Sequence, residues 1–319
     1  MGYRLYKSQT VLTVYESELK KNKLNLNNMS DKRFYRNFDF KAAEKIIRLA
    51  LKEDVGKGDV TSELLIPKSN KSVANLMMKE PGVVAGIGIF KLVHKIVDPK
   101  TVVNTVCPEG QIIKKCARIA QIKGSSRSLL KAERLSLNII QRMSGIATAT
   151  YSMTSKLKNP DIKIVDTRKT TPNFRMFEKL AVKIGGGDNH RFGLYDMMLI
   201  KDNHIEANGG IENTLLKLKK SKVSRELKVE IEVQNLDELM TVLRLGKGIV
   251  DIVMLDNFSI EDIKKAVKLN NKMFKIEVSG GVNYRTIGNF SSIKGINIIS
   301  VGALTHSVRS LDLSLDFIS

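Results

Sequence analysis

The chain has 319 residues, of which 42% are hydrophobic, and it carries a formal net charge of +20. This length and composition exclude an intrinsically disordered protein and allow two ordinary domains, or one barrel with a smaller appended domain. No apolar run approaches the roughly 18 residues of a membrane-spanning helix, so we expect no membrane association. The two cysteines, Cys107 and Cys116, lack the spacing of a zinc or redox motif. They indicate no disulfide framework and fit a reducing compartment, so we expect a cytoplasmic protein.

The excess of basic residues raises the question of nucleic-acid binding. The lysines are scattered over predicted helices and loops, and no aromatic-rich strand pattern or known nucleic-acid motif accompanies them. We therefore expect a solvated lysine-rich surface and no nucleic-acid partner, although a field of this sign would attract a polyanionic small molecule. A nucleic-acid-binding protein is kept as the alternative from a different functional class.

Residues 1–37 differ from the rest of the chain. They are rich in asparagine between Asn22 and Asn28, show no clear periodicity and contain no signal-peptide core. We expect an N-terminal extension that is disordered or, if translation starts at Met29, not translated. Because arginine and serine are not prominent in it, a targeting role has little support.

The pattern becomes regular at Asp39, a candidate N-cap before a helix with one apolar face, and Gly56–Asp59 should end that helix. Short β-type runs follow over 73–78, 101–106 and 118–122, with a helix over 89–97 among them. These elements predict a small α+β domain. A long helix should then start at Ser125–Ser126 and end at Gly145.

Strand-like runs then recur near residues 163, 199, 230, 253, 277 and 299, with helical patterns over 174–183, 211–220, 236–245 and 260–269. This alternation predicts parallel βαβ units. No G-x-G-x-x-G follows a strand, which disfavours a dinucleotide-binding fold. Charged residues or glycine-containing turns follow the predicted strands one after another. That distribution favours an α/β barrel, whose active site collects at the C-terminal strand ends.

A cationic group is predicted at two strand ends and in the loop between them, from Arg168, Lys169, Arg191 and Lys201. Any one of these could be a surface charge, but four at such positions, beside His190, indicate an anion site. The glycines at 185–187 permit a tight turn that would bring His190 and Arg191 inward. Zinc is not expected, because no histidine or cysteine pair has ligand spacing.

Carboxylates and glycine turns end the later strands. Glu230 and Glu232 alternate with valines, so both should point into the barrel. Two interpretations stay open: salt-bridged interior side chains, because unpaired buried carboxylates are costly, or, beside Asp256, ligands of Mg²⁺ or of ribose hydroxyls. The turns Ser279-Gly280-Gly281 and Val301-Gly302-Ala303 could offer backbone N–H groups to a phosphate.

Sequence runs spread over the chain match one family in order and at family-like spacing, from about residue 38 to the C-terminus. They are Glu53–Thr61, Glu133–Asn138, Ser144–Thr148, Asp166–Pro172, Gly185–Arg191, Lys201–His204, Leu255–Asn257, Ser279–Gly281 and Val301–Ser307. Together they resemble the quinolinate phosphoribosyltransferases, also called nicotinate-nucleotide pyrophosphorylases (carboxylating). The departures are the leader over 1–37 and Cys116, which stands where a glycine is expected.

The resemblance implies an incomplete, type II phosphoribosyltransferase-like α/β barrel over 131–306. It also implies an N-terminal α+β open-faced sandwich over 38–130, joined by residues 307–319. A homodimer with shared active sites is implied as well, and a higher oligomer is left open. The implied reaction transfers phosphoribosyl from phosphoribosyl pyrophosphate to quinolinate with decarboxylation, giving nicotinate mononucleotide, pyrophosphate and CO₂ in de novo NAD biosynthesis.

The resemblance also implies site roles. Lys169, Lys201, Glu232 and Asp256 would be the catalytic residues. Glu232 and Asp256 would hold the ribose and a Mg²⁺ ion bound largely through the substrate, and the two glycine turns would bind the 5-phosphate. Quinolinate and pyrophosphate would be surrounded by Arg134 from the partner subunit and by Thr167, Arg168, Lys169, His190, Arg191 and Lys201.

Two alternatives within this resemblance remain. One is a related phosphoribosyltransferase that acts on another heterocyclic carboxylate. The other, a catalytically inactive regulatory homologue, is disfavoured because Lys169, Lys201, Glu232 and Asp256 are all intact.

Overall fold

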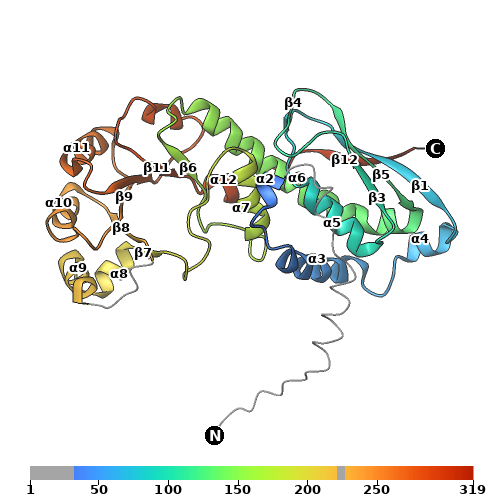
Figure 1. Cartoon of the computed structure of the whole chain (residues 1–319), viewed down its shortest axis with the longest axis horizontal. Helices are drawn as coiled ribbons and strands as arrows, with labels where there is room; N and C mark the ends of the chain where they lie inside the picture. The colour runs from blue at the N-terminus through green and yellow to red at the C-terminus, as the bar shows by residue number, and fades with distance from the viewer. Residues whose placement is uncertain (1–31, 221–226, 319) are drawn as a thin grey trace, which may run out of the picture.

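The structure is a computed structural model in which residues 32–220 and 227–318 are described (Figure 1). The chain forms two parts that share one long helix, α6 (Ser126–Lys156). One part contains an antiparallel sheet and the other a parallel sheet. None of the described helices is long and apolar enough to cross a bilayer.

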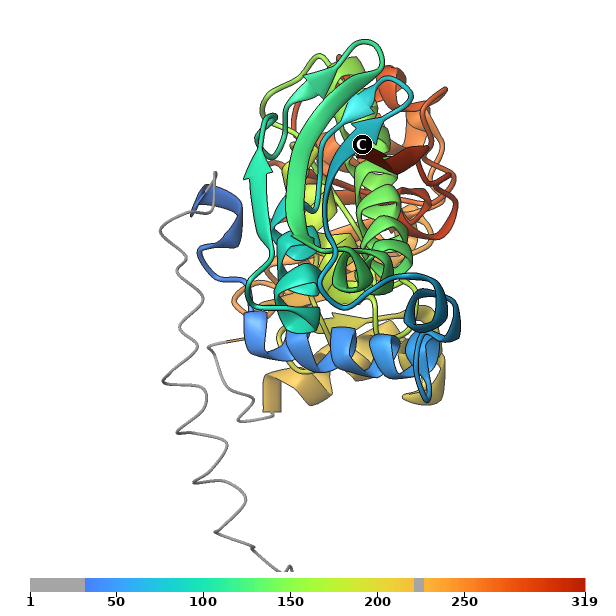
Figure 2. The same cartoon turned by 90° about the vertical axis from the view of Figure 1, so that its right-hand side faces the viewer.

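The antiparallel sheet has four strands in the order β12-β1-β5-β3. Side chains from one of its faces, including Leu76, Ile122 and Leu315, form a core with Phe90 of α5 and Ile140 of α6. The helices therefore cover one face of the sheet, which confirms the open-faced sandwich (Figure 2). Its elements are α3 (Phe40–Val55), α4 (Val60–Leu65), β1 (Lys71–Met78), β2 (Gly82–Val83), α5 (Ile87–Val97), β3 (Val102–Thr105), β4 (Ile112–Ile113), β5 (Ala117–Ser125) and β12 (Leu313–Ile318).

The predicted helices and strands of this part are confirmed. The Asp39 side chain accepts a hydrogen bond from the Ala42 N–H at 2.9 Å and caps α3, which ends at Gly56. Strand β12, from the very end of the chain, pairs with β1 in antiparallel register from Val73↔Ile318 to Met78↔Leu313. The C-terminus is thus a strand of the N-terminal sheet.

The prediction that the long helix ends at Gly145 is wrong. Helix α6 has 31 residues and continues to Lys156. A side chain at position 145 would overlap the backbone carbonyl of Arg309. Glycine is therefore needed there for the close approach of another segment, not for a helix end. Because α6 is continuous, it also spans the expected domain boundary at residues 130 and 131.

The folded region begins before residue 38. Within the described residues it starts with α2 (Lys32–Tyr35), and the Tyr35 side chain is only 6% exposed. The Tyr35 hydroxyl donates to the buried Glu109 carboxylate. Phe38 lies with its ring centroid 5.8 Å from that of Tyr35 and 6.2 Å from that of Phe177 in α7 (Arg175–Ile184). Residues 32–38 therefore join the two parts, whereas Asn22–Asn28 and Met29 lie outside the described residues.

The parallel sheet has six strands in the order β6-β11-β10-β9-β8-β7. Its edge strands β6 and β7 do not pair with each other in the described part, so the barrel is incomplete, as expected for this fold. All six strands and the four helices predicted between them are confirmed. The elements are β6 (Lys163–Val165), α7 (Arg175–Ile184), β7 (Met198–Ile200), α8 (Asp202–Ala207), α9 (Ile211–Lys220), β8 (Val229–Val233), α10 (Leu236–Leu245), β9 (Ile252–Asp256), α11 (Ile260–Asn270), β10 (Lys275–Ser279), η2 (Ile287–Phe290), β11 (Ile298–Ser300) and α12 (Ala303–His306).

Candidate active site

Most of the predicted site residues follow the C-terminal ends of the parallel strands. Because these strands run in the same direction, their ends meet on one side of the sheet. Arg168 and Lys169 follow β6, Lys201 follows β7, Glu232 lies in β8, and Asp256 ends β9. The loops after β10 and β11 supply Ser279, Gly280, Gly281, Val301, Gly302 and Ala303.

The two arginines are the less exposed members of the cationic group. The Arg191 side chain is mostly buried, and its guanidinium donates to the Met197 carbonyl at 3.3 Å. The Nε of Arg168 is buried and has no partner among the described residues. Burial and the nearby charge of Arg168 lower the pKa of Arg191. Two adjacent cations with spare donors are costly to bury unless an anion joins them, so this arrangement suits the predicted anion.

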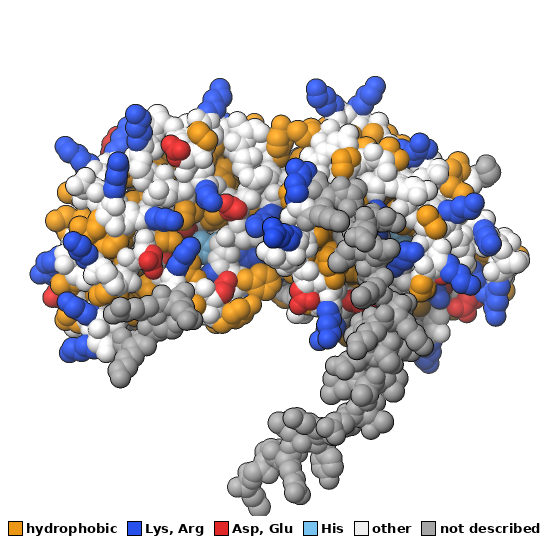
Figure 3. All heavy atoms as spheres, in the orientation of Figure 1, with side chains coloured by type: hydrophobic (Ala, Val, Ile, Leu, Met, Phe, Trp, Pro, Cys, Tyr) orange, Lys and Arg blue, Asp and Glu red, His pale blue; other side chains and the backbone are white. Residues whose placement is uncertain are grey.

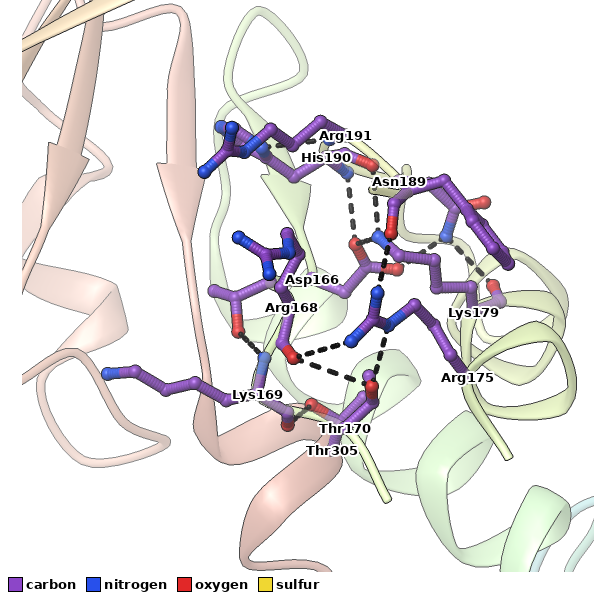
Figure 4. A network of polar contacts seen from close by, with 12 residues as sticks. Asp166, Arg168, Lys169, Thr170, Arg175, Lys179, Asn189, His190, Arg191 and Thr305 are labelled. Carbon is purple, nitrogen blue, oxygen red and sulfur yellow. Dashed lines mark hydrogen bonds and ion pairs between the residues drawn. The ribbon is translucent and has the colours of Figure 1, made fainter. Parts of the chain in front are cut away.

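The neighbouring lysine points toward the same region. Figure 4 shows the charged ends of Arg168, Arg191 and Lys169 on one side of the network, with Lys179 and Arg175 on the other. A side chain at Gly302 would lie 3.1 Å from Lys169 Cδ and 3.1 Å from His306 Nε2. Lys169 therefore passes over the backbone of the loop after β11. The predicted cationic group and the predicted phosphate turn are adjacent.

A buried ion pair holds the loop that carries Arg191. Lys179 in α7 donates to the Asp166 carboxylate and, at 2.9 Å, to the His190 carbonyl. Asp166 also accepts from the Asn189 side chain at 2.6 Å and from the His190 N–H at 3.0 Å. Burial raises the pKa of Asp166 and lowers that of Lys179, while the attraction between the two opposes both shifts. The sequence did not indicate Lys179, and it indicated Asn189 only as part of the run Gly185–Arg191, because the partners of both lie in other elements.

A second buried carboxylate organises the loop after Lys169. Glu178 accepts from the Thr171 N–H at 3.1 Å and from the Thr171 hydroxyl at 2.9 Å. Arg142 of α6 donates to Glu178 at 3.0 Å and to the Val308 carbonyl at 2.7 Å. Within the loop, the Thr167 hydroxyl accepts from the Lys169 N–H at 3.0 Å. Thr167 is thus seen to shape the turn, and its predicted contact with substrate stays a prediction.

The two predicted catalytic carboxylates have different partners. Lys201 Nζ lies 2.8 Å from Glu232, which is 6% exposed. The Asn257 side chain donates to Asp256 at 2.7 Å, and Asn257 itself has a positive φ of 57°. A side chain at Gly280 would overlap the Asn257 amide. Asn257 therefore shapes the predicted site, and the sequence indicated it only as a neighbour of Asp256.

Glu230 does not share the surroundings of Glu232, although both point inward. Glu230 is fully buried and lies 3.0 Å from Nε2 of His190, and Glu277 of β10 lies 3.5 Å from the same nitrogen. Of the two interpretations of this pair of glutamates, Glu230 fits the salt-bridged interior side chain. Glu232, near the end of β8, is paired instead with Lys201, whose side chain is 46% exposed.

His190 is held by both ring nitrogens. The Arg191 N–H donates to Nδ1 at 2.8 Å, while Nε2 faces the two glutamates. Burial acts to lower the pKa of His190, and the carboxylates outweigh it and raise that pKa to about 10. Burial also raises the pKa of Glu230 to about 7, while the hydrogen bond to His190 favours the charged carboxylate.

Arg134 does not belong to this cluster. It is exposed on α6, and its side chain makes no hydrogen bond or ion pair with another described residue. Its predicted role requires a second subunit and stays a prediction.

An incomplete α/β barrel with an open-faced sandwich and a strand-end site for anions defines the type II phosphoribosyltransferase class. The model of the quinolinate phosphoribosyl transferase C-terminal domain matches residues 146–316, and that of the N-terminal domain matches residues 59–144. The chain belongs to the quinolinate phosphoribosyltransferase family.

Relatives support this assignment over most of the chain. The chain is 38% identical to the probable nicotinate-nucleotide pyrophosphorylase [carboxylating] of Bacillus subtilis, covering 86% of this chain and 92% of that protein. It is 40% identical to the chloroplastic enzyme of that name from Arabidopsis thaliana, covering 87% and 82%. The structure of nicotinate-nucleotide pyrophosphorylase from Francisella tularensis is similar with a TM-score of 0.80 at 38% identity, covering 87% of this chain and 96% of that one.

Proposed function

We infer that this protein transfers the phosphoribosyl group of phosphoribosyl pyrophosphate to quinolinate and releases pyrophosphate and CO₂. The product is nicotinate mononucleotide, an intermediate of de novo NAD biosynthesis. The observation that carries the inference is the pairing of Arg168 and Arg191, two adjacent guanidiniums with unused donors. Two such groups suit a substrate with two carboxylates, because a monocarboxylate would leave a desolvated cation unpaired.

The proposed reaction has two stages. The quinolinate nitrogen attacks the anomeric carbon of the ribose while the bond to pyrophosphate breaks, and Lys169 and Lys201 stabilise the departing negative charge. Glu232 and Asp256 favour the positive charge that develops on the ribose. The 2-carboxylate then leaves as CO₂, and its bonding electron pair remains on the ring carbon beside the pyridinium nitrogen, which stabilises it. A proton from solvent completes nicotinate mononucleotide.

We propose Mg²⁺ as the metal that accompanies phosphoribosyl pyrophosphate. The carboxylate oxygens of Glu232 and Asp256 are hard donors of the type that Mg²⁺ prefers. Glu232 is already paired with Lys201, so Asp256 and the substrate's own oxygens would hold most of the ion. When bound, it would neutralise pyrophosphate charge.

We also propose a homodimer in which Arg134 reaches the partner's site. Arg134 is exposed and lies outside the strand-end cluster, as this arrangement requires. Two apolar surfaces are available for an interface. Val60, Leu64 and Leu65 of α4 are 81%, 82% and 71% exposed, and Leu194 and Tyr195, close to Arg191 in the sequence, are 72% and 73% exposed. Exposed apolar residues in such groups commonly mark interfaces.

The alternative of nucleic-acid binding finds less support. Basic side chains are spread over the face shown in Figure 3 and do not gather into a single stripe. A cytoplasmic location also stays a proposal, because plant relatives carry chloroplastic or mitochondrial names.

The test mixes the purified protein with phosphoribosyl pyrophosphate, Mg²⁺ and either quinolinate or nicotinate, and measures nicotinate mononucleotide and CO₂. We expect product from quinolinate alone. Product from nicotinate alone would keep the phosphoribosyl site but refute the proposed substrate. No product from either, in correctly folded protein, would refute the proposed activity.

A further inference from the structure

Two of the predicted anion-binding loops lie side by side. Lys169 follows β6, and the turn Val301-Gly302-Ala303 follows β11, the strand that pairs with β6. A side chain at Gly302 would lie 3.1 Å from Lys169 Cδ, so the stem of Lys169 passes directly over the turn. Phosphoribosyl pyrophosphate would contact both loops at once, with its 5-phosphate at the turn and its pyrophosphate at Lys169. The distance between the two loops must therefore match the length of this substrate.

One buried hydroxyl group joins the two loops. Thr305 of α12 is fully buried, and its hydroxyl donates to the Lys169 carbonyl at 2.7 Å. The same hydroxyl oxygen lies 3.2 Å from the Gly302 carbonyl. Figure 4 shows the Lys169 side chain extending to one side while its backbone meets Thr305. The hydrogen bond therefore fixes the backbone from which the Lys169 side chain starts.

The backbone of Thr305 is held independently of its hydroxyl. The Thr305 N–H donates to the Gly302 carbonyl at 3.0 Å, and the Thr305 carbonyl accepts from the Arg142 guanidinium. Arg142 also donates to the buried Glu178 at 3.0 Å. These contacts remain when the hydroxyl is removed, so α12 and the turn should keep their places. The loss of the hydroxyl should therefore act mainly on Lys169.

The other hydrogen bonds of the Lys169 loop are local. The Lys169 N–H donates to the Thr167 hydroxyl at 3.0 Å, and the Thr170 N–H donates to the Arg168 carbonyl at 2.9 Å. Bonds between such close neighbours shape the loop but do not set its distance from the loop after β11. The hydroxyl of Thr305 comes from that second loop, so it can set this distance.

We propose that Thr305 is a positioning residue, which holds Lys169 at the distance from the 5-phosphate turn that phosphoribosyl pyrophosphate requires. The proposal rests on the proposed function for the role of Lys169, which stabilises the departing pyrophosphate. Thr305 is fully buried and acts through Lys169, not by touching the substrate. The sequence indicated Thr305 only as a member of the run Val301–Ser307, without a role of its own.

The first test measures kcat at saturating substrates in Thr305→Val and Thr305→Ser. Valine has nearly the shape of threonine but cannot donate, so a misplaced Lys169 should lower kcat on the order of tenfold. Serine keeps the hydroxyl and should restore most of the lost kcat. Thr214→Val is the matched control, because Thr214 is also buried and its hydroxyl donates to the Gly210 carbonyl at 2.8 Å; it should keep the wild-type kcat. An unchanged kcat in Thr305→Val, or no recovery in Thr305→Ser, would overturn the proposal.

Ligand binding separates a positioning role from general damage to the site. Calorimetry with inorganic pyrophosphate and Mg²⁺, and separately with ribose 5-phosphate, reports on Lys169 and on the turn. Thr305→Val should weaken pyrophosphate binding on the order of fivefold and leave ribose 5-phosphate binding unchanged. Equal weakening of both ligands would overturn the proposal. Lys169→Ala/Thr305→Val should bind pyrophosphate no worse than Lys169→Ala alone, and a further loss in the double variant would also overturn it.

Amide hydrogen exchange of the ligand-free protein separates this proposal from the proposed function. Exchange over residues 167–171 should be faster in Thr305→Val than in the wild type and normal in Thr305→Ser, whether or not the protein turns over quinolinate. Unchanged exchange in Thr305→Val would overturn the positioning role. Faster exchange in that variant, together with no turnover in the wild type, would refute the proposed function and leave the link between the loops in place.

A further variant decides the question if Thr305→Val does not fold. Thr305→Cys replaces the hydroxyl by a thiol, which is a much weaker donor of similar size. We expect a kcat for Thr305→Cys below that of Thr305→Ser, with faster exchange over residues 167–171. Wild-type values of both quantities would overturn the proposal.

Discussion

At the scale of single residues, Glu232 and Asp256 show how similar carboxylates acquire different partners. Glu232 is nearly buried and paired with Lys201, whereas Asp256 is held by the amide of Asn257 at the rim. Alternation in the strand Val229–Val233 predicted that Glu230 and Glu232 share a face. It could not predict that one of them meets His190, because that contact depends on a loop 40 residues away.

Removing either rim charge should slow the chemical step. We expect Asp256→Asn and Glu232→Gln each to lose about 2–4 kcal/mol of transition-state stabilisation, as for other preorganised charges. Each variant should therefore have a lower kcat. The measurement is kcat at saturating quinolinate and phosphoribosyl pyrophosphate. Glu261→Gln, an exposed acid of α11, serves as the control and should retain wild-type turnover. Near-wild-type turnover of Asp256→Asn would contradict the assignment.

At the scale of elements, α6 joins the two parts of the molecule. Its apolar positions reach both hydrophobic cores, with Ile140 in the core of the sandwich and Ile146 in that of the barrel. By local pattern alone, Gly145 predicts a helix end, because glycine often follows a helix. Only the tertiary contact with Arg309 explains why glycine stands in the middle of α6.

Gly145→Ala tests this contact. In an ordinary helix interior the change would stabilise by about 1 kcal/mol. Here we expect a loss of about 1–3 kcal/mol in the free energy of unfolding, because the methyl group must displace the Arg309 backbone. Denaturant unfolding measures the change. Gly288→Ala is the matched control, since its nearest neighbour would be Lys156 Cε at 3.6 Å, an ordinary contact. A stabilised Gly145→Ala variant would refute the explanation.

The packing of α5 on α6 should make stability depend on pH. His94 is buried beside Ser136, with Nε2 3.2 Å from the hydroxyl, and burial lowers the pKa of His94 to about 3. Between that pKa and its ordinary value of 6.5, the unfolded chain binds a proton that the folded chain does not. The free energy of unfolding should therefore fall as the pH drops from 6.5 toward 3.

His94→Phe should flatten this slope, and unfolding curves across the pH range measure it. An unchanged slope in the variant would show that His94 is not its source.

At the scale of the whole molecule, the site of a single chain contains the strand-end groups but not Arg134. The exposed apolar side chains of α4 and of the loop after Arg191 offer surfaces for a partner. A shared site predicts that two defective subunits can complement each other. The N-terminal sheet also depends on long-range contact, since β12 from the end of the chain completes it.

Mixed subunits test the shared site. Arg134→Ala and Asp256→Asn, refolded together, should regain activity at about a quarter of all sites, because each mixed dimer contains one intact site. Quinolinate-dependent product formation is the readout. Glu232→Gln mixed with Asp256→Asn is the control and should regain nothing, since both changes affect the same half of the site. Mixed dimers without regained activity would contradict the arrangement.

Local patterns in the sequence were enough to predict the strand–helix alternation, the capped helix at Asp39 and the polar residues at the strand ends. Period and turn chemistry are properties of neighbouring residues, so they can be read along the chain. The sequence runs that resemble family motifs also indicated to which family the chain belongs. The pairing of Asp166 with Lys179, the bridge from His190 to Glu230 and Glu277, and the course of α6 past Gly145 were settled only by the three-dimensional structure. These contacts join residues from different elements, and a local pattern states which face a side chain occupies but not which distant group it meets.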